Sequence, residues 1–122
     1  MSTIKANTLL HSDGSTTTQP SIPALDKRMA KAWVNLDMAT GTIQESYNIS
    51  SVTDASVGKF TINMSYTFAN ANYVVIGTAS GAGSGVTSDT SYHLNTTTSF
   101  QTLVKTNQVY IDRVVSYVTF GN

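Results

Sequence analysis

The side chains best suited to acid–base chemistry in this chain are two histidines and seven acidic residues. His93 with a nearby carboxylate such as Asp89 would suit a small hydrolase that acts on host polysaccharide. His93 is also explained as a solvent-facing or interface residue, because Tyr92 would point to the opposite face of the same strand. We expect this second role. The other histidine, His11, lies in a polar N-terminal segment, and no Gly-x-Ser-x-Gly motif accompanies either of them.

The remaining acidic residues do not form a pattern typical of catalysis or of metal binding. Asp37, Glu45, Asp54 and Asp112 fall at the ends or outer faces of predicted strands, where structural roles are expected. Two histidines and no cysteine cannot build a closed zinc site, and an Asp-rich calcium loop is absent. We therefore expect no catalytic residue, no cofactor and no metal site within one chain. An ion on a symmetry axis would leave no signature in a single sequence.

A glycine-rich segment reads Ala79-Ser-Gly-Ala-Gly-Ser-Gly-Val86. It lacks the lysine of a phosphate-binding loop and lies between strands, so we interpret it as a hairpin tip. Loops at the end of a rigid β scaffold are common recognition sites, and small polar groups beside an aromatic ring suit a sugar or a protein. The predicted recognition loop comprises Gly81, Gly83, Gly85, Asp89, Tyr92 and His93.

The composition excludes several classes of protein. Charged residues make up 11% of the chain and sum to a formal net charge of zero, while Ser, Thr, Asn and Gln make up 47 of the 122 residues. Seven basic residues give little electrostatic drive for binding nucleic acid. Apolar runs are too short for membrane insertion, and the N-terminus has no signal-peptide pattern. Zero net charge also removes the self-repulsion that keeps copies of a chain apart.

Residues 1–30 differ from the rest of the chain and are predicted to form an extended N-terminal arm. Both prolines and a threonine run interrupt any helical or strand period there, and a short helical turn is expected over residues 25–31. We expect the apolar residues of the arm to contact a neighbouring chain or another protein. They are Ile4, Leu9, Leu10, Ile22 and Leu25.

Residues 31–122 have the pattern of a single β domain. Phe60, Ile62 and Met64 alternate with polar residues, which is typical of a strand with one buried face. In the last strand, both faces carry apolar residues, so both are predicted to be covered. About seven short strands with turn signals between them predict an antiparallel β-sandwich. The predicted strands are 31–37, 41–49, 57–66, 72–80, 90–96, 100–106 and 111–120.

Several stretches resemble a β module found in bacteriophage tail-fibre and related virion proteins, which carries Ala-Trp-Val-Asn and Ser-Tyr-Asn-Val-Ser-Ser motifs. The start of the chain is also similar to the opening of many phage fibre chains, and its end to the close of the module. The matching stretches are Met1-Ser-Thr-Ile-Lys-Ala-Asn-Thr8, Lys31-Ala-Trp-Val-Asn-Leu-Asp37, Gly41-Thr-Ile43, Ser46-Tyr-Asn-Ile-Ser-Ser-Val-Thr-Asp54, Gly58-Lys-Phe-Thr-Ile62, Asn70-Ala-Asn-Tyr-Val74 and Val118-Thr-Phe-Gly121.

The resemblance implies a non-enzymatic virion structural protein, here expected as a free-standing small protein made in the host bacterial cytoplasm. The alternatives are a fibre-like or tail-associated component, a capsid decoration or cement protein, and a module that binds a host-surface glycan or protein. Identical chains arranged around a symmetry axis can cover each other's exposed strand edges. A symmetric homo-oligomer, foremost a homotrimer, is therefore predicted. Its other partners would be capsid or tail proteins, with no nucleic acid.

Overall fold

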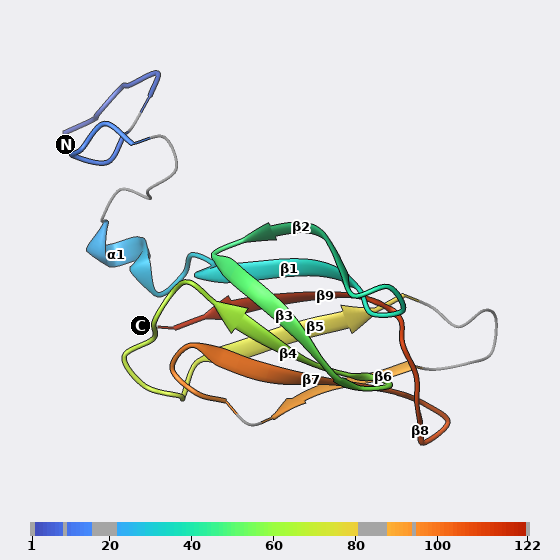
Figure 1. Cartoon of the computed structure of the whole chain (residues 1–122). Coiled ribbons are helices and arrows are strands. Elements are labelled where there is room, and N and C mark those ends of the chain that lie inside the picture. Colours follow the sequence, from blue (N-terminus) through green and yellow to red (C-terminus); the bar gives the residue numbers. More distant parts are fainter. Residues whose placement is uncertain (1, 9, 16–21, 81–87, 94, 122) are drawn as a thin grey trace.

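The computed structural model describes residues 2–8, 10–15, 22–80, 88–93 and 95–121. Figure 1 shows two layers of strands, with the N-terminal segment and a short helix, α1 (Pro23–Asp26), lying to one side of them. The helix begins at a proline, whose fixed φ and missing N–H suit the first helical position. It lies earlier in the chain than the helical turn predicted over residues 25–31.

The strands of the described residues pair into two antiparallel sheets. Sheet A has the strand order β2-β1-β9-β5, and sheet B has the order β3-β4-β7-β6, with β8 also paired to β7. This arrangement confirms the predicted antiparallel β-sandwich. The strands are β1 (Ala32–Asp37), β2 (Thr42–Tyr47), β3 (Ile49–Ser56), β4 (Lys59–Met64), β5 (Val74–Ala79), β6 (Ser88–His93), β7 (Ser99–Thr106), β8 (Val109–Tyr110) and β9 (Val114–Phe120).

The core lies between the two sheets and is built from alternate residues of the central strands. Every second residue of β1, β4, β7 and β9 is buried, as expected for strands with one face on a core. Two of these buried positions are threonines. The Thr102 hydroxyl bonds to the backbone of Phe60, and the Thr119 hydroxyl bonds to that of Ala32. Both hydroxyls are therefore satisfied although neither is exposed.

The prediction of about seven strands omitted β3 and the two-residue β8. The predicted strand 41–49 is interrupted at Asn48, where a φ of 55° turns the chain from sheet A into sheet B. Strand β3 is an edge strand and is mostly exposed, so its hydroxyl-rich sequence lacks the alternation that reveals a buried strand. The predicted strand 111–120 begins only at Val114, and β6 lies slightly earlier than predicted.

Two glycines in turns between strands adopt the conformation that favours glycine. Gly41 has a φ of 67° and Gly58 has a φ of 70°. The two positions differ in the space around them. A Cβ on Gly41 would lie 3.8 Å from the Phe60 ring, whereas a Cβ on Gly58 would lie 2.6 Å from the Val104 carbonyl oxygen.

The sandwich is closed along one side by side-chain hydrogen bonds that join β6 to β5 and to β9. The Thr90 hydroxyl donates to the Gly77 carbonyl at 3.1 Å, and the Tyr117 hydroxyl donates to the Ser91 carbonyl at 3.4 Å. Gly77 is necessary for this packing, because a Cβ there would lie 2.2 Å from the Tyr117 ring. The edge strands β5 and β6 thus cover part of each other's free side.

Tyr73 is buried just before β5, and its hydroxyl donates to the Ser99 carbonyl at 2.7 Å. Burial, with a smaller contribution from the negative charge on ionised Tyr92, raises the pKa of Tyr73 to about 12. An unfolded chain releases this proton near pH 10. Between these values the unfolded state binds fewer protons, so the free energy of unfolding falls as pH rises.

We expect the wild-type protein to lose up to about 2 kcal/mol of stability from Tyr73 between pH 10 and pH 12, because its pKa is about 12 in the folded chain and 10 in the unfolded one. Tyr73→Phe removes this loss, although it is less stable by about 1 kcal/mol at neutral pH without the hydrogen bond to Ser99. Urea unfolding at pH 8 and pH 11.5 measures both effects. Tyr47→Phe is the control, and parallel pH dependences for wild type and Tyr73→Phe would contradict the assignment.

The described part of the N-terminal arm is exposed. Ile4 is 88% exposed, and Leu10, Ile22 and Leu25 are also exposed. Leu9 lies outside the described residues. The junction between arm and sandwich is tied by one ion pair, because the Asp26 carboxylate meets the ammonium of Lys31, a residue only 5% exposed. No helix in the described part of the chain is long and apolar enough to cross a membrane.

Candidate functional site

The predicted recognition loop is described only in part. Gly81, Gly83 and Gly85 lie outside the described residues. Tyr92 and His93 are exposed at the end of β6, and the backbone of Asp89 pairs with Lys105 near its start. Two positions four apart in a strand are separated by roughly 13 Å, which is too far for His93 and Asp89 to share a proton. The hydrolase pair considered from the sequence therefore has no support in the backbone geometry.

The other acidic residues take part in turns. The Asp37 carboxylate accepts a hydrogen bond from the Ala39 N–H at 3.0 Å, and the Asp112 carboxylate accepts one from the Gly58 N–H at 2.7 Å. Glu45 and Asp54 are exposed on edge strands. No group of three or more His, Cys, Asp or Glu side chains that could hold a metal ion occurs among the described residues.

His11 belongs to a local turn of the arm. Its ring nitrogen Nδ1 lies 3.0 Å from the Asp13 carboxylate, and its carbonyl accepts a hydrogen bond from the Gly14 N–H. A hydrogen bond from the Ser15 N–H, and then the neighbouring His11, lower the pKa of Asp13. These contacts all join residues within one turn, so they stabilise a bend and create no recognisable site.

The most distinctive surface of the molecule is the outer face of sheet A. The strand register brings four apolar or aromatic side chains into one row across all four strands. We call this the apolar row, and it consists of Tyr47, Trp33, Val118 and Ile76. Ile76 is 55% exposed, and Val74, which pairs with Phe120 beside the row, is 52% exposed.

A second row, made of polar residues, runs beside the apolar row. It consists of Glu45, Asn35, Ser116 and Thr78. The two rows line a shallow groove of about 500 Å³. At its floor the side-chain oxygen of Asn35 is buried and makes no hydrogen bond. A buried amide oxygen without a donor is unfavourable, so this position is incomplete in the isolated chain.

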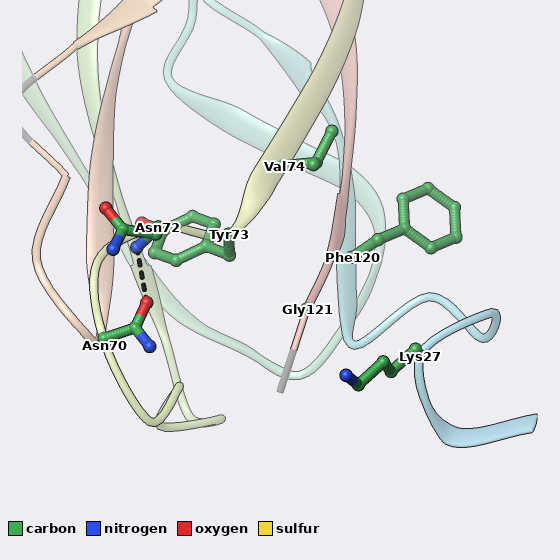
Figure 2. Close-up of a pocket in the computed structure, with 7 residues that line it drawn as sticks. All are labelled: Lys27, Asn70, Asn72, Tyr73, Val74, Phe120 and Gly121. Carbon is green, nitrogen blue, oxygen red and sulfur yellow. Dashed lines mark hydrogen bonds between the residues drawn. The ribbon is translucent and has the colours of Figure 1, made fainter. Parts of the chain in front are cut away.

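A basic side chain, Lys27, lies near the same face, beyond the side of the apolar row that faces away from the polar row. Figure 2 shows Lys27 beside Phe120 and Gly121, in a pocket of about 320 Å³ at the end of β5 and β9. The floor of this pocket is tightly packed, because a Cβ on Gly121 would lie 2.9 Å from Tyr73 and 3.1 Å from Phe68. A turn held by the hydrogen bond from the Asn72 N–H to the Asn70 side chain forms its other side.

The outer face of sheet B is more polar, although Leu103 lies on it in the row of Lys59 and Ser91. One row across its strands consists of Thr53, Thr61, Gln101 and His93, and the next consists of Ser51, Asn63 and Ser99. The Asn63 amide donates to the hydroxyls of Ser51 and Thr53, at 3.1 and 3.4 Å. These groups satisfy one another or face water, so this side of the sandwich is suited to exposure.

No family model, no curated protein and no solved structure matches this chain. The functional proposal therefore depends on the surfaces described above and on the sequence resemblance.

The apolar row has no signature as a unit in the sequence. The apolar character of the last strand did signal part of it, since both faces of that strand were predicted to be covered. The missing information was the pairing of β1 with β9, which joins Trp33 to Val118 across 85 positions of the chain. Such pairing is set by the tertiary fold and has no local signature.

Proposed function

We propose that this chain is a non-enzymatic bacteriophage virion structural protein, a homo-oligomeric fibre-like or tail-associated component that is attached through its N-terminal arm. The observation that carries the proposal is the contrast between the two outer faces of the sandwich. An apolar face on one side and a hydroxyl and amide face on the other are typical of a subunit with one side packed against protein and one side in water.

The segments that resemble the phage module lie at the framework of this sandwich. Lys31–Asp37 spans β1, Gly58–Ile62 enters β4, and Asn70–Val74 leads into β5. Trp33 belongs to the stretch that resembles the Ala-Trp-Val-Asn motif of the phage module, and it lies in the apolar row. The resemblance thus includes an outward-facing position as well as core positions, which supports a shared mode of packing.

The arm supports attachment rather than independent folding. Its described residues before α1 form no strand or helix, and its apolar side chains are exposed. A segment with few apolar residues gains too little from burial on its own to offset the loss of chain entropy. Such a segment becomes ordered when a partner covers its apolar side chains.

The direct test is to locate the chain in purified phage particles by immunoelectron microscopy and to measure its copy number by quantitative mass spectrometry. We expect label at the tail or fibres and a small number of copies per particle. Label over the whole head, with a copy number that follows the capsid lattice, would favour the decoration protein instead. Absence of the chain from washed particles would overturn both assignments.

A further inference from the structure

The outer face of sheet A has the features of an interface that is empty in the isolated chain. In its apolar row Ile76 is 55% exposed and Trp33 and Val118 are half-buried on the outward side, and the groove beside the row contains an amide oxygen with no partner. Sheet B, in the same molecule and of similar size, has rows of hydroxyl and amide groups in the corresponding place. The apolar residues on sheet A are therefore not a general property of this low-charge chain.

We propose that this face is covered by the same face of a second copy of the chain, related by a two-fold axis. The inference builds on the proposed function, because it names the surface through which the virion protein self-associates. An apolar face at the middle of a sheet suits an identical partner, since sheets stack face to face about 10 Å apart with interdigitating side chains. It is an alternative to the three-fold arrangement predicted from the sequence.

The charges on the face are complementary under a two-fold rotation. Glu45 lies on β2 in the polar row, on one side of the apolar row, and Lys27 lies beyond the opposite side, near the ends of β9 and β5. Neither makes an ion pair with any described residue. A two-fold axis in the plane of the face and between these residues places each Glu45 opposite the Lys27 of the other copy. Two equivalent ion pairs then flank one apolar centre.

The size of the face predicts a reversible dimer. Four strands of six or seven residues have a flat area of roughly 400 Å², which side-chain relief increases, against about 800 Å² per partner in a standard interface. Attachment of neighbouring arms to one particle would raise the effective concentration of the copies and complete the pairing there. The average mass of the particles that the isolated protein forms in solution should therefore increase with protein concentration.

Sedimentation velocity over a wide concentration range tests the apolar contact. We expect the wild-type protein to pass from 13.0 kDa to twice that mass, and Ile76→Lys to remain monomeric throughout. The matched control is Thr53→Lys, which places the same side chain on the outward face of the other sheet's edge strand. It should dimerise as the wild type does. Circular dichroism confirms that both variants are folded.

A charge-reversal series tests the two-fold arrangement. Glu45→Lys and Lys27→Glu should each raise the dissociation constant about tenfold, since each creates two repulsive contacts in the dimer. The double variant should recover near wild-type affinity, because the pairs are restored with their signs exchanged. Asp54→Lys, on the edge strand of sheet B, is the control and should have no effect. Failure of the double variant to recover affinity would overturn the proposed pairing.

Other results would separate this inference from the proposed function. A wild-type protein that stays monomeric at every concentration, or that forms a trimer, would overturn the two-fold dimer and leave assignment to the virion intact. Deletion of residues 1–21 should not change the dimer. If that deletion abolishes self-association, the face is covered by an arm, and the proposal is wrong. Absence of the chain from particles would instead refute the proposed function while the dimer could still form.

Discussion

Replacement of Gly58 by alanine should destabilise the protein by more than about 4 kcal/mol, an exceptional loss for the addition of one methyl group. A Cβ at this position would lie 2.6 Å from the Val104 carbonyl oxygen and 2.7 Å from the Ile111 nitrogen. Both are backbone atoms, so no side-chain rotation relieves the contact. The hydrogen bonds from the Val104 N–H to Gly58 and from the Gly58 N–H to Asp112 would be lost together.

Gly41→Ala is the matched control for this prediction. Its φ is nearly the same as that of Gly58, but an added Cβ meets only the Phe60 ring at 3.8 Å. It should therefore show only the penalty of a left-handed backbone, about 1–2 kcal/mol. Urea unfolding followed by circular dichroism and by the fluorescence of the single tryptophan measures both variants. Equal losses for the two would show that close packing at Gly58 contributes nothing.

Deletion of residues 1–21 should abolish incorporation into particles while leaving the sandwich folded. The deleted arm residues that the structure describes are exposed apart from the half-buried His11 and Ser15, and the hydrophobic core lies wholly within residues 32–117. Gel analysis of particles assembled with the truncated chain measures incorporation, and circular dichroism measures folding. Normal incorporation would refute attachment through the arm, and loss of β signal would refute the separation of arm and domain.

A longer deletion tests the junction. Removing residues 1–26 also removes Asp26, the carboxylate that meets the buried ammonium of Lys31. The Tyr66 ring, whose centroid lies 5.6 Å from that ammonium, then remains as a favourable contact. We expect this deletion to be less stable than the shorter one by about 1–3 kcal/mol, because a buried charge loses its partner. Equal stability would show that the ion pair has no net effect.

The parts of the fold that could be predicted from the sequence are those with strong local periodicity. Phe60, Ile62 and Met64 show a strand because a period of two follows directly from one buried face. Strand β3 could not be found in this way. It is a mostly exposed edge strand, and its hydroxyl side chains do not alternate regularly with apolar ones. The break at Asn48 also has no clear signal, because asparagine adopts positive φ only in some of its contexts.

The candidate surface was less predictable than the core. Trp33, Val118 and Ile76 are each unremarkable apolar residues within strands, and their alignment depends on which strands are neighbours. Glycines and histidines are easier to identify as candidates in a sequence, because flexible loops and titratable groups are recognised by residue type alone. Surfaces formed by register across a sheet need the strand order, which is a property of the whole chain.

The position of β9 has a consequence for the way this protein is made. The last strand of the chain lies between β1 and β5 in sheet A, and Thr119 bonds to Ala32 across 87 positions. A nascent chain therefore cannot complete sheet A until β9 has been synthesised, and folding waits for contacts of very long sequence separation. A prematurely terminated chain lacks the strand that joins β1 to β5 and yields no partly folded subunit with an intact sheet-A face. A chain that stops before β9 thus has no complete sheet A.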